Sequence, residues 1–581
     1  MKRFLWLGFV LCLYLICSGC GDTFRPIIIP NPPTFPNPKA AHTVVAINDN
    51  GTVVPGTAMV IDVSGDTDVS VVNVAVAPVH AVQQTANEVL VVNRAVTGLN
   101  VPTTSCLVTF PATPPNHVFN VCSSITKLNF SGTVIGGTNA ISLPIYSGAN
   151  FVAVAPSSTT AYVTMPTYPP DPTQPLNILP SVAVVNTQSN TTQTTVPVGQ
   201  NPVALAVTPN NGKLYVANQG DSTISGFDIV TLGLSQRMGS PMHTTSPPIW
   251  LAARTDNQRV YVLEQGSGVL AEIDTTSTAG PDTLTEYSNT YSVPGATTMV
   301  YDSNKNRLYI PGGPLMKIID VSQTPAQVLA TISIPNVPGL PNAVPASAVA
   351  VAALPDGSRA YVASVPSSAQ PSQASISAVQ GDGTTATYTY TWTGGHDLTP
   401  GITVAVSGIA SPNDGFNGTY AITAVSGTSC DQSTQVCTFQ AANSTVLKTQ
   451  TAVMGLASST IDNLFPQVTV VNVSSNFIKT TIGIPGFPDA TNPNTPMYYA
   501  AVCVPPTPLT RYRATFRFMM AAGGDSSRAY LSSCDGGNVN IIDTSTDSYI
   551  LNLPAPIGSR PPIPPNPQNP PQNPVFLFAG P

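Results

Sequence analysis

The chain has 581 residues, and only 8% of them are Asp, Glu, Lys or Arg, whereas an ordinary soluble domain carries about 25%. With 21 basic and 28 acidic residues the formal net charge is −7, and Lys and Arg are not clustered anywhere. Because phosphate backbones are bound through such clusters, the composition argues against nucleic acid as a partner. Abundant Val, Thr, Ser, Asn, Gly and Pro favour strands and turns over helices.

Residues 1–20 have the pattern of an export signal. The basic pair Lys2-Arg3 precedes the apolar run Phe4–Ile16, which is shorter than the roughly 20 residues that a transmembrane helix needs. The run ends in CSGC, which resembles the bacterial lipobox, with a cysteine where a leucine is usual. The resemblance implies lipidation at Cys20; an ordinary cleaved signal peptide is the alternative.

Lipidation would place the protein in the cell envelope. More than one acyl chain on Cys20 anchors a protein stably to a membrane. Gly21, in place of Asp after the modified cysteine, implies forwarding to the outer membrane by the same resemblance. We therefore expect an exported, lipid-anchored protein on the periplasmic or outer face of that membrane.

Two Pro-rich segments flank the informative part of the chain. Residues 21–42 predict an extended, semi-rigid tether, and residues 554–581 predict a Pro-rich C-terminal tail. The tail ends in an apolar VFLF (575–578) that could pack on the domain.

Between these tails the sequence repeats. The stretch Asn201–Ile229 predicts three strands, Val203–Val207, Lys213–Ala217 and Thr223–Ile229, separated by Asn, Gly and Asp turns. Alternating apolar positions and short turns are typical of an antiparallel meander. The same pattern recurs at His80–Gln83 with Glu88–Asn93, Phe151–Val154 with Ala161–Thr164, Ile249–Ala252 with Arg259–Leu263, Thr297–Tyr301 with Arg307–Ile310, Ser347–Ala352 with Arg359–Ala363, and Phe516–Ala521 with Arg528–Leu531.

Tyrosines mark the period of this repeat. Successive second strands carry a tyrosine 46–53 residues apart, at Tyr162, Tyr215, Tyr261, Tyr309 and Tyr361, and Tyr530 resumes the series. Four-stranded units at such a period indicate a β-propeller, in which each sheet covers the faces that its neighbour cannot bury alone.

The units LYVANQGDSTISGFDI and AVTPNNGKLYVAN resemble the YVTN-type β-propeller repeat of bacterial surface proteins. The resemblance is strong over residues 150–365 and weaker over 43–95 and 512–553. It implies a fold and a surface location, and it implies no reaction.

We predict an all-β fold, a seven-bladed β-propeller with a small inserted β domain; eight blades is the alternative. Met59–Val76 has the pattern of two outer strands without an inner pair, and this leaves a surplus strand or two. The propeller is expected over residues 43–372 and 463–553. Residues 373–462, with four or so alternating strands, predict a β-sandwich or barrel between the second and third strands of one blade.

Six cysteines follow the export signal, an even number in an oxidising compartment, which suggests disulfides. Fifteen pairings are possible in principle. Proximity in sequence favours Cys430–Cys437 and Cys106–Cys122, which leaves Cys503–Cys534. A metal site is disfavoured because the cysteines form no C-x-x-C pair and have no nearby histidine.

The sequence shows no catalytic, metal or cofactor constellation. The five histidines (His42, His80, His117, His243 and His396) lack metal-ligand spacing, and His80 is expected near a channel mouth as a structural residue. Asp62, Asp66 and Asp68 fit a turn better than a Ca²⁺ loop. Asp228, Asp274, Asp320 and Asp543 are expected to cap backbone amides in turns. Lys213, Arg259, Arg307, Arg359 and Arg528, which open second strands, are expected to be solvated turn residues.

Three functions remain open. A non-catalytic envelope scaffold that binds a protein or glycan is favoured. A lactonase-like or other hydrolytic propeller would need carboxylates, His or Arg converging on the channel. A structural or adhesive surface role is the third, and fold alone does not choose among them.

Overall fold

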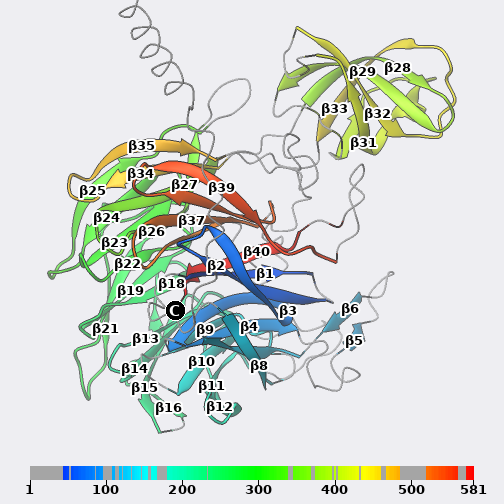
Figure 1. Cartoon of the computed structure of the whole chain (residues 1–581). Coiled ribbons are helices and arrows are strands. Elements are labelled where there is room, and N and C mark those ends of the chain that lie inside the picture. The colour runs from blue at the N-terminus through cyan, green and yellow to red at the C-terminus, as the bar shows by residue number, and fades with distance from the viewer. Residues whose placement is uncertain are drawn as a thin grey trace, which may run out of the picture. The chain divides into compact units, whose positions relative to one another are not determined.

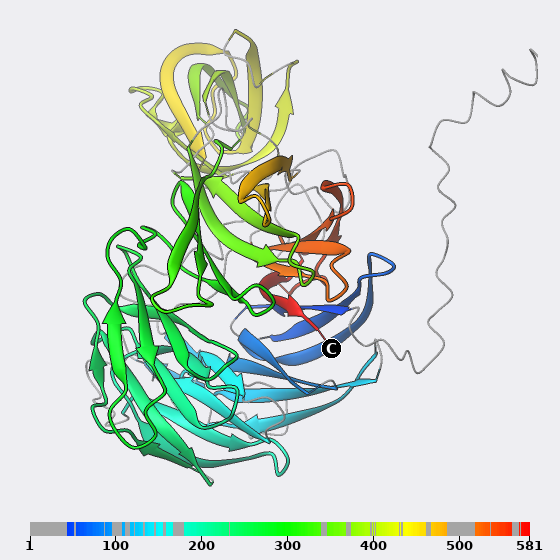
Figure 2. The same ribbon diagram turned by 90° about the vertical axis from the view of Figure 1, so that its left-hand side faces the viewer.

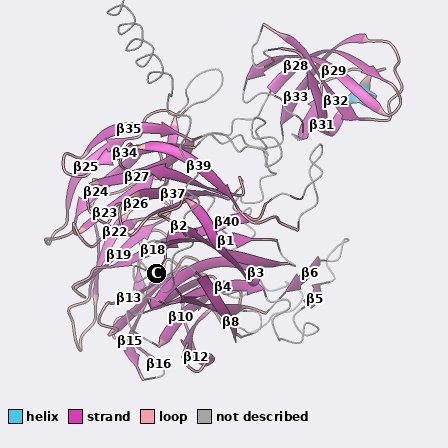
Figure 3. Ribbon diagram, in the orientation of Figure 1, coloured by secondary structure: helices cyan, strands magenta, loops and turns pink. Residues whose placement is uncertain are grey.

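The computed structural model describes residues 43–580, except for 52–53, 86, 96–106, 111–116, 121, 132–133, 145–146, 155–158, 167–178, 232, 338–344, 368–372, 395–397, 399, 401–402, 429, 431–433, 460–465, 485–517, 535, 560–568 and 570. The signal, Cys20 and the tether therefore lie outside the described residues. The described chain is all-β, as predicted, apart from one short 3₁₀ helix, η3 (Asp414–Phe416) (Figure 3). None of the described helices is long and apolar enough to cross a membrane.

A seven-stranded antiparallel sheet joins the two ends of the described chain. Its strands, in spatial order, are β40 (Asn573–Ala579), β1 (Thr43–Asp49), β2 (Pro55–Asp62), β3 (Thr67–Thr85), β4 (Glu88–Ala95), β7 (Ser124–Ser131) and β8 (Val134–Ser142). Figure 1 shows the red β40 beside the blue β1. The VFLF segment, which we counted with the tail, thus supplies an edge strand.

The long strand β3 belongs to two groups within this sheet. Its first half pairs with β2, from Asp62↔Thr67 to Pro55↔Val76, and its second half pairs with β4, from Val76↔Ala95 to Thr85↔Glu88. Ala77 at the change of partner has a positive φ of 52°. The first half is largely exposed and the second largely buried, so β3 ends one four-stranded group and begins the next.

Six further antiparallel sheets follow in chain order, and each is named here by its first strand. They comprise β9 (Phe151–Val154), β10 (Thr160–Met165), β11 (Ser181–Asn186) and β12 (Thr191–Pro197); β13 (Pro202–Val207), β14 (Lys213–Asn218), β15 (Thr223–Val230) and β16 (Gly233–Gln236) with β17 (Met242–His243); β18 (Pro248–Ala253), β19 (Arg259–Glu264), β20 (Leu270–Asp274) and β21 (Thr283–Glu286); β22 (Val300–Asp302), β23 (Arg307–Gly312), β24 (Leu315–Asp320) and β25 (Gln327–Ser333); β26 (Ala346–Ala353), β27 (Arg359–Pro366), β34 (Gln467–Asn472) and β35 (Phe477–Gly483); and β36 (Phe518–Ala522), β37 (Arg528–Ser533), β38 (Asn538–Asp543) and β39 (Ser548–Pro554). A separate pair is formed by β5 (Leu107–Phe110) and β6 (His117–Asn120).

Turn chemistry sets where these strands end. The turn between first and second strands has a left-handed residue, which is Asn211, Asn257 or Asn306 in three sheets and Gly357 in a fourth. The turn between third and fourth strands has another, as at Asn190. Asn and Gly tolerate a positive φ better than other residues do, so a short turn at these positions closes each hairpin at a fixed register.

One predicted strand is shorter than expected. The sequence pattern predicted Thr297–Tyr301, whereas β22 runs from Val300 to Asp302. The preceding residues make a turn at Gly295, whose φ is 79°, and a side chain on Gly312 would collide with Ala296. The irregular segment therefore packs against the end of β23 in place of extending the first strand.

The repeated tyrosines lie between the sheets. Tyr162, Tyr215, Tyr261, Tyr309, Tyr361 and Tyr530 are all at most 1% exposed. Each apolar cluster of the repeated region draws on neighbouring sheets: Tyr215 of β14, for example, shares a cluster with Val260 of β19. Burial of a sheet face therefore requires the next sheet, as the repeat predicted.

The series of sheets returns on itself. First strands contact one another along it: β3 touches β9, β9 touches β13, β13 touches β18, β22 touches β26, β26 touches β36, and β36 touches β40, which touches β3. A shared apolar cluster joins the β18 and β22 sheets. Figure 2 shows the succession from another side. This is a β-propeller fold, which confirms the coarse prediction.

Between β27 and β34 the chain forms a closed barrel, one of the two architectures that the sequence left open. Its six strands are paired in the order β28 (Gln373–Gly381), β29 (Thr385–Gly394), β32 (Val436–Ala442), β31 (Gly418–Ser426), β30 (Thr403–Ser407) and β33 (Thr451–Ser459), which pairs again with β28. Closure leaves no edge strand with unpaired backbone groups.

Candidate functional site

His80 lies on the second half of β3 in an aromatic stack. Its ring is 3.8 Å from that of Phe151 on β9 and 4.3 Å from that of Phe576 on β40, measured between centroids. The backbone N–H of Val152 points at Nδ1 from 3.4 Å. The imidazole is 5% exposed, and this burial lowers its pKa to about 3. It is a neutral packing residue at the junction of three strands, which agrees with the structural role predicted for it.

The hydrolytic alternative requires titratable side chains on the first strands, which are the strands nearest the propeller axis. The first strands are β40, the second half of β3, β9, β13, β18, β22, β26 and β36. Apart from His80 and Tyr301, their described residues include one such side chain, Asp302 of β22. Its Oδ1 accepts the N–H groups of Asn304 and Lys305 in the following turn. These residues lend the hydrolytic alternative no support.

The basic residues that open second strands are not solvated, and that prediction is wrong. Lys213 of β14 reaches the next sheet, where its Nζ donates to the carbonyls of Thr275 and Ser277 at 2.6 Å and lies 2.9 Å from Asp282. The Tyr215 hydroxyl donates to the same carboxylate at 2.7 Å. Burial and this contact raise the pKa of Tyr215 well above its usual value.

The arrangement recurs at two other junctions. Arg359 and Lys479 lie 2.7 and 2.5 Å from the carboxylate of Asp547, which also accepts the hydroxyl of Tyr361 at 2.6 Å. Arg528 binds Asp66 through two nitrogens, at 2.8 and 3.0 Å. Arg359 and Arg528 therefore join a second strand to a turn of the neighbouring sheet, and Lys479 joins the fourth strand β35 to the same turn as Arg359.

Arg307 and Arg259 make different contacts from the cations above. Arg307 donates to the carbonyl of Val473 in the next sheet, whereas Arg259 pairs within its own sheet with Glu272 and Asp274, at 3.3 and 3.0 Å. All of these contacts lie within a sheet or between neighbouring sheets, so each has a role in folding.

The aspartates at the ends of third strands mostly cap turns, as predicted. Asp274, Asp320 and Asp543 each accept the backbone N–H two residues on, at 2.7–2.9 Å. Asp228 differs, because it forms an ion pair with Arg237.

The acidic segment around Asp62 is occupied by turn and sheet contacts. Asp62 accepts the N–H of Ser64 at 3.1 Å, and Asp66 is the partner of Arg528. Across the described part of the chain, no three His, Cys, Asp or Glu residues are grouped so that they could hold a metal ion.

A second acidic pair was not singled out from the sequence. Glu264, at the end of β19, is fully buried and accepts the N–H of Ser246 at 2.7 Å. Glu286, at the same end of this sheet, accepts both the N–H and the hydroxyl of Thr245. Burial, with the neighbouring Glu286 as a smaller cause, raises the pKa of Glu264 to about 7. The pair fastens the 244–247 loop of the preceding sheet.

The cysteine predictions are met where the chain is described. Cys430 and Cys437 form a disulfide, as predicted. Cys122 and Cys534 are also disulfide-bonded. Cys106 and Cys503, their predicted partners, lie outside the described residues, so those two pairings stay predictions.

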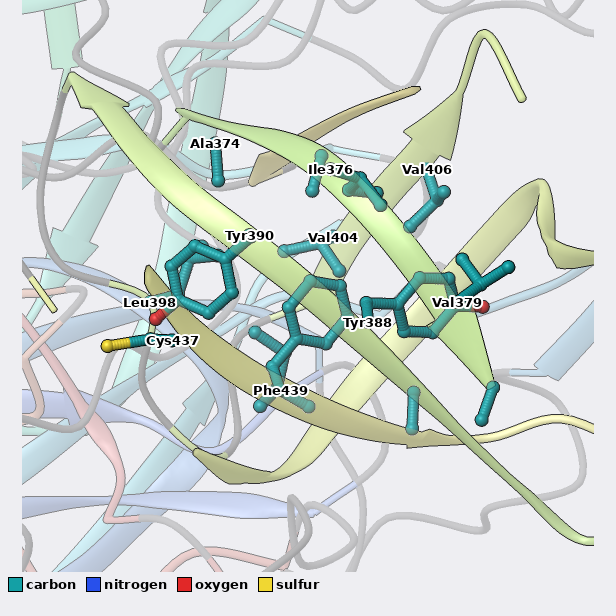
Figure 4. Close-up of a cluster of buried hydrophobic side chains, with 14 of the residues drawn as sticks. Ala374, Ile376, Val379, Tyr388, Tyr390, Leu398, Val404, Val406, Cys437 and Phe439 are labelled. Atoms are coloured by element: carbon teal, nitrogen blue, oxygen red, sulfur yellow. The ribbon is translucent and has the colours of Figure 1, made fainter. Parts of the chain in front are cut away.

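The barrel has its own aromatic core. Tyr388 and Phe439 stack at 4.6 Å between ring centroids, and the Tyr388 hydroxyl donates to the carbonyl of Phe416 at 3.0 Å. Figure 4 shows Tyr388, Tyr390 and Phe439 within the cluster, beside Val404. Because inward positions hold the core, alternate positions on each strand face outward.

The outward positions of the barrel carry an unusual surface. None of the six strands contains Asp, Glu, Lys, Arg or His. The outward residues of β29 are Thr385, Thr387, Thr389 and Thr391, which are partly exposed, and Thr393, which is exposed. The sequence displayed this row as TATYTYTWT, but without the barrel's inner and outer faces it predicted only a strand. This uncharged hydroxyl surface is the candidate site.

No protein-family model matches the sequence, and no curated protein does. Among similar solved structures are apo AztD from Citrobacter koseri (8% identity, TM-score 0.46, covering 92% of this chain and 97% of AztD) and a putative 6-phosphogluconolactonase from Bacteroides uniformis (11%, 0.36, 55% and 89%). A third is the β-propeller domain of Cps50 (Swd1) from Myceliophteria thermophila (9%, 0.31, 70% and 87%). These neighbours are β-propeller-like. Their TM-scores are low, so the description of the fold rests on the strand pairing and sheet contacts given above.

Proposed function

We propose that this chain is a non-catalytic lipoprotein of the cell envelope, whose propeller is a scaffold that presents the inserted barrel to a protein or glycan partner. The observation that carries the proposal is the barrel itself, a closed sheet with its own hydrophobic core that is inserted between β27 and β34. Insertions on a rigid scaffold are where binding functions concentrate.

The scaffold is proposed to have eight blades. One blade consists of β40, β1, β2 and the first half of β3, and the next consists of the second half of β3 with β4, β7 and β8. The six remaining sheets complete the ring. Eight blades give the surplus outer strands Met59–Val76 an inner partner, which the seven-blade count did not.

The anchor is proposed to be the lipid on Cys20, followed by the Pro-rich tether of residues 21–42. Metabolic labelling with a tritiated fatty acid tests this, because the wild-type chain should take up label and Cys20→Ser should not. Wild-type protein in the outer-membrane fraction supports the location, and wild-type protein released without label contradicts it.

The binding role is tested by replacing residues 373–459 with a short Gly-Ser linker. The intact chain and the deletion variant, both anchored, are cross-linked in envelopes and their bound proteins and glycans compared. A partner that the intact chain retains and the variant loses supports the proposal. Identical partner sets contradict the role of the barrel, and turnover of a lactone by the purified chain would contradict the non-catalytic scaffold.

A further inference from the structure

The strands of the barrel differ from those of the propeller in charge. Second strands of the propeller begin with Lys213, Arg259 or Arg307, and third strands end in Asp274 or Asp320. In the barrel, the charged side chains among the described residues are confined to connections, at Asp382, Asp414 and Lys448. The strands themselves therefore form a wall without formal charge, and Lys448 lies in the connection that Gln380 of β28 contacts.

Outward hydroxyl and amide side chains lie in register across three adjacent strands. Thr387 of β29 lies opposite Gln380 of β28 and Gln440 of β32. Thr391 lies opposite Ser375 and Val436 on the same two strands. Because alternate residues recur every ~7 Å along a strand and strands are ~4.8 Å apart, these groups form a regular two-dimensional array.

Much of the hydrogen-bonding capacity of this array is unused by the protein. Thr389 accepts a hydrogen bond from Gln450 at 3.0 Å, and Gln380 donates to the carbonyl of Lys448 at 3.1 Å. Within the described residues, the hydroxyls of Thr387 and Thr391 take part in no side-chain hydrogen bond. A hydroxyl both donates and accepts, so these groups can pair with further hydroxyls in either direction.

Exposed apolar side chains lie beside the array on β33 and within it on β32. On β33, next to β28, Met454 is 86% and Leu456 47% exposed, and Leu456 lies opposite Ser375. On β32, Val436, the partner of Thr391, is 64% exposed. The surface thus combines uncharged hydrogen-bonding side chains with exposed apolar ones.

Charge complementarity narrows the class of partner. Nucleic acids and anionic glycans are bound through Lys and Arg, and the strands of the barrel have none. Protein interfaces depend on buried Trp, Tyr and Arg anchors, whereas the barrel's Tyr388, Tyr390 and Trp392 point into its own core. An uncharged polymer of sugar rings matches both features, since it carries many hydroxyls and also apolar C–H faces.

We propose that the outer face formed by β28, β29 and β32, bordered by β33, binds a neutral polysaccharide. This inference rests on the proposed scaffold function and specifies its partner as an uncharged glycan chain. The Thr, Ser and Gln side chains of these strands hydrogen-bond the sugar hydroxyls, and Leu456, Met454 and Val436 contact the ring faces. Since no ion pair forms, binding is insensitive to salt.

The test is co-sedimentation of the purified full chain with insoluble neutral polymers: swollen cellulose, chitin, a β-1,3-glucan and starch. Alginate and heparin gels serve as charged comparisons. We expect retention on at least one neutral polymer, unchanged between about 50 and 500 mM NaCl, a range over which charge-dependent binding falls steeply.

Substitutions on β29 locate the site. Thr387→Ala with Thr391→Ala should weaken retention about tenfold, the loss expected for two hydrogen bonds. Thr387→Glu with Thr391→Glu should abolish it, because each carboxylate would be desolvated against an uncharged partner. Thr419→Glu, an exposed threonine on β31, is the matched control and should bind as the wild type does. Trp392 fluorescence verifies that each barrel is folded.

The proposal is overturned if no neutral polymer is retained, if only the charged gels bind, or if the β29 variants bind as well as the control does. These outcomes differ from failure of the scaffold function. If deletion of the barrel abolishes binding of a partner but the intact chain binds no neutral polymer, the scaffold function is supported and the polysaccharide proposal is contradicted.

Discussion

The barrel and the propeller sheets bury their aromatic residues in different ways. Tyr388, Tyr390 and Phe439 contact only the barrel's own residues within their cluster, which spans positions 374–457. Tyr215 instead shares its cluster with the neighbouring β18 sheet, and Tyr361 shares one with the β36 sheet. A closed sheet completes its own core, whereas an open sheet needs neighbours, so the barrel should unfold independently and the propeller as one unit.

Two tryptophans allow each region to be observed separately. Among the described residues, Trp250 lies on β18 of the propeller and Trp392 on β29 of the barrel. A Trp250→Phe background therefore reports the barrel, and a Trp392→Phe background reports the propeller. Denaturant unfolding in the two backgrounds should give distinct midpoints, and coincident transitions would contradict independence.

The largest effect is expected from removing β40, by ending the chain after Gln572. Val575, Phe576 and Leu577 are at most 6% exposed, and burying a large apolar side chain stabilises by about 1.5–3 kcal/mol. The propeller should lose about 5 kcal/mol or more of unfolding free energy, measured in the Trp392→Phe background, while the barrel midpoint stays unchanged. Removal of Pro581 alone is the control. A propeller that unfolds normally without β40 would show that the ring does not depend on this strand.

The reverse experiment truncates the barrel core. Phe439→Ala removes a fully buried ring that stacks on Tyr388 and should cost the barrel about 3–5 kcal/mol. The propeller transition should not move. Phe477→Ala, at a phenylalanine that is 73% exposed on β35, is the control and should alter neither transition appreciably. Equal loss in both regions would refute the autonomous core.

A smaller effect follows from breaking one inter-sheet ion cluster. Asp547→Asn keeps a residue type that tolerates the positive φ of 52° at this position, but it leaves Arg359 and Lys479 without their carboxylate. Because both cations are partly exposed, we expect a loss of about 2 kcal/mol from the propeller. Asp382→Asn, at a barrel turn, should leave the propeller unaffected. An unchanged propeller midpoint in Asp547→Asn would show that these clusters contribute specificity without stability.

The smallest effect depends on pH. The pKa of Glu264 is about 7 in the folded protein, whereas its ordinary value, which applies to the unfolded chain, is 4.5. The folded state therefore holds this proton more tightly, and its stability falls as the pH rises from 4.5 to 7. Glu264→Gln should stabilise the propeller by about 1–2 kcal/mol at pH 8 and have little effect at pH 4. Glu88→Gln is the control. Stabilisation that is equal at both pH values would exclude titration of Glu264 as its cause.

Local features were predictable because they depend on short-range rules. The strand Lys213–Ala217 was predicted almost to the residue as β14, and the amide caps at Asp274 and Asp320 followed from turn chemistry. Cys430–Cys437 followed from proximity in sequence. The role of Lys213 was missed because its partner, Asp282, belongs to the next sheet.

The candidate site was visible only in part. The sequence shows the threonines of TATYTYTWT, and alternation places them on one face of a strand. Which face is solvent and which strands flank it depend on the closure of β28 to β33, because the pairing of Thr387 with Gln380 and Gln440 joins three segments.

The sequence by itself determined the repeat, the strands and the turns, since apolar alternation and residues such as Asn211 and Gly357 act within a few positions. The tertiary structure alone decided that β40 pairs with β1, which cations bind which sheets, and that the inserted strands close into a barrel. These choices are made by surface burial between distant segments, and local pattern contains no information on which partner buries a given face.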